Sequence, residues 1–361
     1  MEDSPAPEGQ NPFAPSLVFH YEEGTAFRGF FGGNQMTIGN KFVMSAAVCA
    51  ASLFYSSAAS AQATRTWVSG TGSDANPCSR TAPCQTFAGA ISKTAAGGEI
   101  NCLDPGGFGA VTITKSMTIN CEYTEGGVLA GGNGITVNAL ATDTVVLRGL
   151  DVFGVNPPTH GIRVIQAASV TIEDTTIRRF NAANSVGISF TPSNANARLI
   201  VNNVTVTENG NAASGGGIVI QPTGTGSAVV SLRDVRIFNN ANNGIRIDST
   251  GNTGTRNIVM IENVNLTGNG HGIAVTAPVG VTPAGVMIKN SAIVGNGFGI
   301  IANGGLATVR VSDTAITGNT TGVSTANSAA IFSYGDNLLD ANPDNVTPNN
   351  GTFTGVVIPK R

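Results

Sequence analysis

Residues 261–300 read IENVNLTGNGHGIAVTAPVGVTPAGVMIKNSAIVGNGFGI, and this stretch contains the pattern that decides the fold. Residues 261–266 and 288–293 each show an aliphatic residue, a variable residue, Asn, two further residues and a second aliphatic residue. A Gly-Ile pair follows each of them, at Gly272 and Gly299. Asn tolerates a left-handed backbone at low cost. Each six-residue element therefore predicts a strand, a one-residue corner and a second strand.

The same elements repeat from residue 134 to residue 323. Pairs of glycine and an aliphatic residue occur at intervals of 23 to 30 residues, beginning at Gly134, Gly161, Gly187, Gly217, Gly244, Gly272, Gly299 and Gly322. The corner position is occupied by Gly149, Asp174, Asn203, Asp234, Asn263, Asn290 and Asp313. Three or four residues before a glycine stand Asn240, Asn269, Asn296 and Asn319, whose amides are expected to form a ladder of stacked side chains.

Short strands of this kind bury their inward side chains only when successive coils cover one another. The leucine pattern of leucine-rich repeats and the four-strand unit of a propeller blade are both missing from the repeat. The sequence therefore predicts an all-β fold, a right-handed parallel β-helix, with Ile, Val and Leu pointing inward.

Residues 83–108, PCQTFAGAISKTAAGGEINCLDPGGF, resemble the opening of secreted β-helix proteins of the pectin-lyase-like superfamily. The likeness extends to about residue 339, with Glu99 in place of the usual Asp. It implies a short N-terminal capping α-helix before the first coil. The spacing of Phe87, Ile91 and Ala95 supports that helix independently, because the three residues share one helical face.

Residues 36–63 have the three parts of a bacterial-type export signal: Lys41, an apolar stretch over 42–55 and a small-x-small site at Ala61 and Ala63. We therefore expect a secreted or periplasmic protein. Residues 1–35 are interpreted as an upstream extension from a start codon assigned too early, or as a disordered segment. The remaining divisions are a disulfide-stapled segment with the cap helix (64–98), the β-helix (99–339) and a C-terminal tail (340–361).

Four cysteines remain after the signal, Cys78, Cys84, Cys102 and Cys121, and an even number in an exported chain indicates disulfides. Four cysteines allow three pairings, and the sequence does not choose strictly among them. Cys102 and Cys121 lie about one coil apart, which favours pairing them and leaves Cys78 with Cys84. Zinc is the alternative, but no Cys-x-x-Cys spacing is present.

The charge balance excludes several function classes. Without residues 1–63 the chain has 17 basic and 17 acidic residues, so nothing favours nucleic acid or anionic lipid as a partner. We expect no membrane span in the mature chain, no metal site and no cofactor. Neither a Gly-x-Ser-x-Gly nor a His-Glu-x-x-His motif is present.

If the Ile or Val of each Gly-aliphatic pair points inward, two rows of alternate residues after it point outward. The first row is Thr136, Arg163, Ser189, Val219, Arg246, Ala274, Ile301 and Ser324, and the second is Asn138, Ile165, Thr191, Gln221, Asp248, Thr276, Asn303 and Ala326. Arg246 and Asp248 are the catalytic candidates, with an ordinary surface ion pair as the alternative. The candidate binding residues are Thr136, Asn138, Arg163, Thr191, Gln221, Thr276 and Asn303.

Two functions are compatible with these rows. The pectin-lyase-like resemblance implies a polysaccharide lyase or glycoside hydrolase acting on acidic polysaccharide. Such enzymes need a carboxylate cluster for calcium or an acid and a base flanking one bond. Because the two rows contain a single carboxylate, Asp248, the sequence favours an exported, non-catalytic protein. It would bind a polysaccharide or cell-surface glycan, or serve a structural role.

Overall fold

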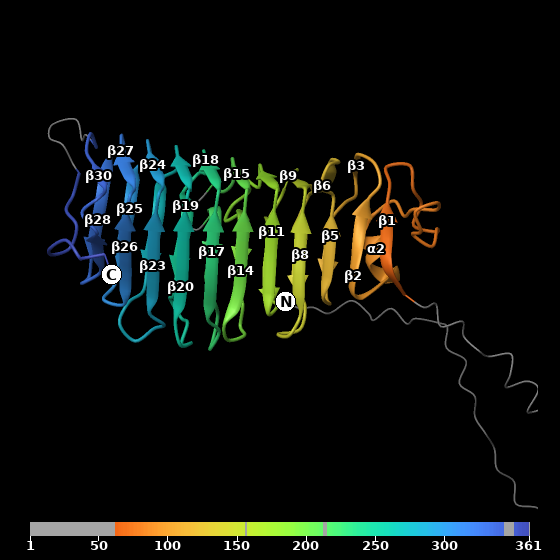
Figure 1. Ribbon diagram of the computed structural model, residues 1–361, viewed down its shortest axis with the longest axis horizontal. Coiled ribbons are helices and arrows are strands. Elements are labelled where there is room, and N and C mark those ends of the chain that lie inside the picture. The colour runs from red at the N-terminus through yellow and green to blue at the C-terminus, as the bar shows by residue number, and fades with distance from the viewer. Residues whose placement is uncertain (1–61, 156, 212–214, 343–349, 361) are drawn as a thin grey trace, which may run out of the picture. The chain divides into compact units, whose positions relative to one another are not determined.

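The computed structural model describes residues 62–155, 157–211, 215–342 and 350–360 as an all-β, right-handed parallel β-helix, as predicted (Figure 1). The upstream extension lies outside the described residues, and of the predicted export signal only Gln62 and Ala63 are described, with Ala63 as the first residue of β1. Three parallel sheets run along the stack, and each coil from β2 to β28 contributes a strand to sheet 1, then sheet 2, then sheet 3. No helix among these residues is long and apolar enough to cross a membrane.

Sheet 1 contains β1 (Ala63–Val68), β2 (Thr94–Cys102), β5 (Met117–Asn120), β8 (Thr144–Arg148), β11 (Ser169–Glu173), β14 (Ala197–Asn202), β17 (Ala228–Arg233), β20 (Asn257–Glu262), β23 (Ala284–Lys289), β26 (Ala307–Ser312) and β29 (Ala330–Ser333). Sheet 2 contains β3 (Gly106–Gly107), β6 (Gly126–Ala130), β9 (Leu150–Gly154), β12 (Thr176–Arg178), β15 (Thr205–Thr207), β18 (Arg236–Phe238), β21 (Asn265–Thr267), β24 (Ala292–Val294), β27 (Ala315–Thr317) and β30 (Leu338–Leu339). Sheet 3 contains β4 (Val111–Ile113), β7 (Ile135–Asn138), β10 (His160–Gln166), β13 (Val186–Phe190), β16 (Gly216–Ile220), β19 (Asn243–Asp248), β22 (His271–Thr276), β25 (Phe298–Asn303) and β28 (Thr321–Ala326).

The corners between sheets 1 and 2 have the predicted left-handed backbone. Asp174 has φ 50° and Asn263 has φ 53°, and Asn203, Asp234, Asn290 and Asp313 lie in the same region. Gly149, with φ 70°, occupies the equivalent corner one coil earlier. A single left-handed residue turns the chain sharply, so the strand before it and the strand after it join different sheets.

The interior is a set of columns of stacked aliphatic side chains. Ile245, Ile273 and Ile300 pair in register on successive strands of sheet 3, and all three are fully buried, as predicted. The glycine before each has a steric reason: a Cβ at Gly272 would lie 2.6 Å from the carbonyl oxygen of Gly299. At these glycine positions the backbones of successive coils lie too close together to leave room for a side chain.

A buried ladder of asparagine amides lies at the turn between sheets 2 and 3. The side-chain oxygen of Asn296 accepts hydrogen bonds from the backbone N–H and the Nδ2 of Asn269, each at 3.0 Å. The same pair of bonds connects Asn209, Asn240, Asn269, Asn296, Asn319 and Asn342 in succession. Asn342 makes the same pair of bonds to Asn350, so the predicted ladder is confirmed and extends one residue further at its N-terminal end and two further at its C-terminal end.

The N-terminal end is closed by helix α2 (Phe87–Lys93), whose N-cap Thr86 accepts a hydrogen bond from the Gly89 N–H. Phe87 is buried against Phe108, with ring centroids 5.2 Å apart. The expectation that Ala95 continues this helix is wrong, because β2 already begins at Thr94. The β-branched Thr94 favours an extended backbone, and its hydroxyl bonds the Ala90 carbonyl at the end of the helix.

Both predicted disulfides are present, Cys78–Cys84 and Cys102–Cys121. The loop closed by the Cys78–Cys84 disulfide also covers β1, the outermost strand of sheet 1. The Trp67 N–H donates to the Cys78 carbonyl, and the Cys84 N–H donates to the Trp67 carbonyl. An uncovered parallel edge is a template for pairing with another chain, so this loop protects part of β1.

The opposite end is closed by residues 350–360. The Val323 N–H donates to the Asn350 carbonyl, and the Thr354 and Ile358 N–H groups donate to carbonyls of β29. Lys360 forms an ion pair with Asp336 at 2.7 Å. The tail therefore covers the last strands of sheets 1 and 3.

Candidate functional site

The first predicted outward row lies in register along sheet 3. Thr136, Arg163, Ser189, Val219, Arg246, Ala274, Ile301 and Ser324 pair one after another on successive strands. The second row is confirmed where Asp248, Thr276 and Asn303 pair in register. The placement of Ile165 in that row is wrong. The register shifts between Val164 and Gln166, so Gln166 lies beside Asn138 and Ile165 is the extra residue of a bulge.

The structure divides the candidate residues into two groups. Ser189 and Val219 are only 5% and 3% exposed, which interrupts the accessible first row. Thr136, Asn138 and Arg163 lie on the N-terminal side of this interruption, and Thr191 is half-buried beside it. The residues that come together are on the C-terminal side: Gln221, Arg246, Asp248, Thr276 and Asn303, which we call the sheet-3 patch.

The centre of the sheet-3 patch is a guanidinium held from two sides. Arg246 Nη2 donates to the Gln221 side-chain oxygen at 3.0 Å, and Nη1 lies 3.7 Å from Asp248 Oδ2. The side chains of Arg246 and Asp248 are only 19% and 13% exposed, and Asp248 Oδ1 also accepts the Thr250 N–H. This pair is therefore more confined than an ordinary surface ion pair, and its guanidinium has a defined orientation.

A small cavity of about 210 Å³ continues the patch toward the C-terminal end. Thr276 and Asn303 line it, together with Pro278, Val279 and Asn327. Asn327 donates to the Asn303 side-chain oxygen at 2.8 Å, which orients that amide. Hydroxyl and amide groups beside an exposed Val279 suit a ligand that has both apolar and hydrogen-bonding faces.

His271 is the first residue of β22, the strand that also contains Thr276. Its ring lies against Phe298, with centroids 5.4 Å apart, and Nδ1 is 3.0 Å from the Asn243 side-chain oxygen. Burial lowers the pKa of His271, so the ring is neutral at pH 7. A neutral, stacked imidazole contributes shape and one hydrogen bond rather than charge.

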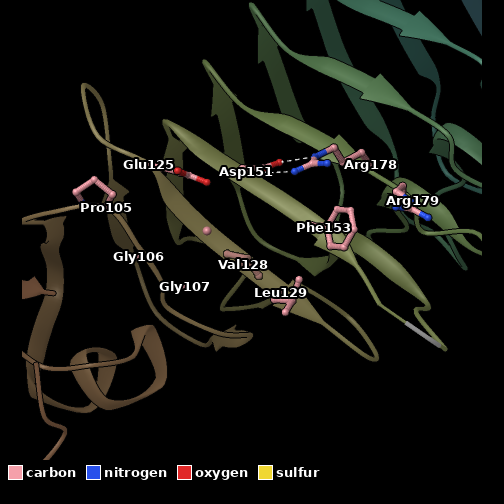
Figure 2. A pocket seen from close by; sticks show the side chains of 11 residues that line it. Pro105, Gly106, Gly107, Glu125, Val128, Leu129, Asp151, Phe153, Arg178 and Arg179 are labelled. Carbon is pink, nitrogen blue, oxygen red and sulfur yellow. Dashed lines mark hydrogen bonds and ion pairs between the residues drawn. The ribbon is translucent and has the colours of Figure 1, made fainter. Parts of the chain in front are cut away.

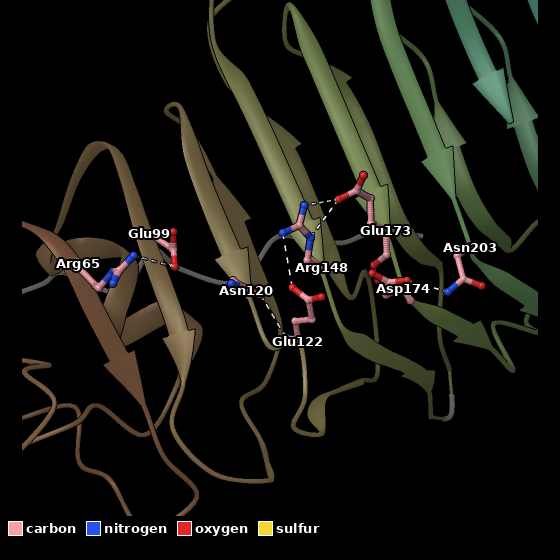
Figure 3. Close-up of polar contacts among 9 residues, drawn as sticks. Arg65, Glu99, Asn120, Glu122, Arg148, Glu173, Asp174 and Asn203 are labelled. Atoms are coloured by element: carbon pink, nitrogen blue, oxygen red, sulfur yellow. Dashed lines mark hydrogen bonds and ion pairs between the residues drawn. The ribbon is translucent and has the colours of Figure 1, made fainter. Parts of the chain in front are cut away.

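The acidic residues near the corners of sheets 1 and 2 are mostly paired with neighbouring coils (Figure 3). Arg148 Nε donates to Glu173 Oε2 at 2.9 Å, and its Nη1 lies 3.6 Å from Glu122. The corner residue Asn203 donates to Asp174 at 2.7 Å. Farther along, Glu262 lies between Arg233 and Lys289. No group of three or more potential metal ligands occurs among the described residues.

A larger groove on the outward face of sheet 2 was not found from the sequence (Figure 2). It measures about 590 Å³ and lies over β3, β6, β9 and β12, the first coils of the stack. Figure 2 shows Glu125, Asp151 and Arg178 along one side and Leu129 and Phe153 along the other. The sequence feature that could have indicated this groove is a pair of double glycines, Gly106-Gly107 and Gly126-Gly127, which lie outside the repeat pattern. We call this feature the glycine groove.

The comparisons with known proteins give one structural similarity. No family model matches the chain, and no curated protein matches it. Among solved structures, the chain is similar to one described as the crystal structure of pectate lyase Pel9A. The two are 16% identical, with 77% of this chain and 79% of that chain covered and a TM-score of 0.49.

Proposed function

We propose that this chain is an exported β-helix that binds glycans through the sheet-3 patch and does not cleave them. The observation that carries the proposal is the Arg246 guanidinium, held between Gln221 and Asp248 beside a cavity lined by Thr276 and Asn303. Planar amide, carboxylate and guanidinium groups in fixed orientations match the hydroxyl pairs of sugars.

The carboxylates support the proposal of binding without cleavage. A glycoside hydrolase needs two carboxyl groups on either side of the scissile bond, and a calcium-dependent lyase needs several oxygen ligands. Among the strands of sheet 3 described above, Asp248 is the one acidic residue, and its oxygens already contact Arg246 and Thr250. Binding is therefore expected to be insensitive to chelators.

Export to an oxidising compartment is part of the same proposal. Two disulfides suit the periplasm or the extracellular medium. Cleavage after Ala63 would remove one residue of β1 and leave Thr64 to Val68 in the sheet. Mass spectrometry of the exported protein should therefore show an N-terminus at Thr64, and a mature form that begins at Met1 would contradict export by this signal.

The binding test compares wild type with Arg246→Gln/Asp248→Asn on a glycan array, with uronate release from pectin and alginate measured in parallel. We expect the double variant to lose the glycan binding that depends on the sheet-3 patch and neither protein to release uronates. Arg163→Gln is the matched control, because Arg163 lies in the same outward row but outside the sheet-3 patch. Release of unsaturated uronates by wild type alone would replace this proposal with a lyase.

A further inference from the structure

The floor of the glycine groove contains two glycines, which have no side chain. In sheet 2 the residues Gly107, Gly127, Asp151 and Thr176 pair in register and form one outward column. Thr205, Arg236, Asn265, Ala292 and Ala315 continue that column on later coils. Only the first two positions of the column lack a side chain, so the groove floor there is bare backbone.

Gly107 is not required by the backbone or by packing. It has no left-handed φ, and a Cβ added to it would meet no atom within 4 Å. Gly127 differs, because its Cβ would lie 2.9 Å from the Gly106 carbonyl oxygen. Glycine inside a strand is destabilising relative to residues that have a side chain. The structural effect of Gly107 is therefore to keep the groove open.

The two walls of the groove have different chemistry. On one side Asp151 accepts two hydrogen bonds from Arg178, at 3.0 Å from Nε and 2.6 Å from Nη2, which fixes both planar groups. On the other side Leu129 is 58% exposed and continues into Phe153, whose ring lies 4.6 Å from the Arg178 guanidinium carbon. A flat floor with one apolar wall and one polar wall fits a sugar ring, which has apolar C–H faces and hydroxyls at its edge.

The charges of the groove favour neutral sugars over acidic ones. Arg178 is neutralised by Asp151, and Arg179 lies 3.8 Å from Glu208. Glu125 is exposed at the rim and forms no ion pair among the described residues. The lining therefore has no net positive charge that would attract a uronate. The volume of about 590 Å³ is within the range of roughly 300–1,000 Å³ typical of small-ligand sites.

We infer that the glycine groove is a second, separate binding site that takes neutral hexopyranose oligosaccharides. It lies on sheet 2, whereas the sheet-3 patch lies on another face of the β-helix, so either site can be present without the other.

The test uses the full chain and isothermal titration with cellohexaose, mannohexaose, maltohexaose and a galacturonate hexamer. At least one neutral hexaose should bind, and Gly107→Val should weaken that binding at least about tenfold, because the valine side chain enters the groove. Gly285→Val is the matched control: Gly285 is also a strand glycine whose added Cβ meets no atom within 4 Å, but it lies on sheet 1. Both variants should keep the wild-type unfolding midpoint, since valine suits a strand.

Hydrogen exchange should show protection by the sugar at residues 105–107 and 125–129. Leu129→Asp provides a second disruption at an exposed position, in case the Gly107 variant does not fold. The inference is overturned if no neutral hexaose binds, if Gly107→Val and Leu129→Asp bind it as wild type does, or if the galacturonate binds in the groove. The hydrogen-exchange readout at residues 105–107 and 125–129 reports on the groove alone, which separates a failure of the groove from a failure of the sheet-3 patch.

Discussion

The side-chain oxygen of Asn269 accepts two hydrogen bonds from Asn240, one from its backbone N–H at 3.1 Å and one from its Nδ2 at 3.0 Å. Asn269 in turn donates through Nδ2 to the Ile237 carbonyl and to the Asn296 side chain. A single amide thus satisfies buried polar groups on the coil before it and the coil after it. Side chains with this arrangement determine the spacing of the coils at a turn where no strand pairing is available.

Replacing Asn269 by alanine should lower the free energy of unfolding by about 3 kcal/mol, because it leaves buried groups of Asn240 and Asn296 without their partners. Denaturant unfolding measures the change. Asn265→Ala is the control, since Asn265 is exposed on β21, and it should change the stability by less than about 0.5 kcal/mol. Similar losses in both variants would show that the ladder contributes no stability of its own.

The register of sheet 3 can be tested with two adjacent isoleucines. Ile300 is fully buried in the inward column, whereas Ile301 points outward between Ala274 and Ser324. Ile300→Asp places an unpaired charge in the core and should prevent folding or cost more than about 4 kcal/mol. Ile301→Asp should cost less than about 1 kcal/mol. Circular dichroism and denaturant unfolding distinguish the two, and equal damage would contradict the assigned faces.

The closure of the C-terminal end should depend on pH. The hydrogen bond from Lys360 lowers the pKa of Asp336 from its ordinary value of 3.8 to about 2. A carboxyl with a lower pKa in the folded protein stabilises it above pH 4, and this stabilisation is lost as the pH falls toward 2. Thermal unfolding should show Asp336→Asn below wild type at pH 5, with the difference becoming smaller as the pH falls toward 2. Asp340→Asn, a change at an exposed acid nearby, should show no such convergence.

The two disulfides should contribute different amounts of stability. Cys102 and Cys121 are separated by 19 positions and Cys78 and Cys84 by 6, so the first closes the longer loop. The loop-entropy relation gives about 3 kcal/mol for the longer loop and about 2 kcal/mol for the shorter. Unfolding of the two double serine variants measures both contributions. The opposite order would mean that covering the edge of β1 matters more than the loop entropy does.

The features that the sequence predicted best are those whose cause is local and repeated. A left-handed corner such as Asp174 is specified by its own residue type, and each repeat confirms the spacing of the next. The pairing of Cys102 with Cys121 followed from the same spacing. The end of α2 and the bulge at Ile165 were missed because both depend on partners elsewhere in the chain: Thr94 pairs with Ala63 of β1, and Gln166 pairs with Asn138.

The candidate site was predictable in its rows but not in its accessibility. Alternation along β19 and β22 places Arg246, Asp248 and Thr276 outward. It does not show that Ser189 and Val219 are covered, which separates Arg163 from the sheet-3 patch. The glycine groove escaped prediction because Gly107, Leu129 and Asp151 come from different coils of the N-terminal region, where the repeat is least regular.

The location of the disulfides gives the stack a mechanical polarity. Both disulfides lie between residues 78 and 121, whereas the later coils contain no cysteine and are held to one another by hydrogen bonds, ion pairs and packing. In a protein whose units contact only their neighbours, unfolding starts where the terminal unit is most easily detached and spreads from there. That unit is the C-terminal closure by residues 350–360. Under tension or in denaturant the β-helix should therefore open from its C-terminus and proceed coil by coil toward the cross-linked N-terminal end.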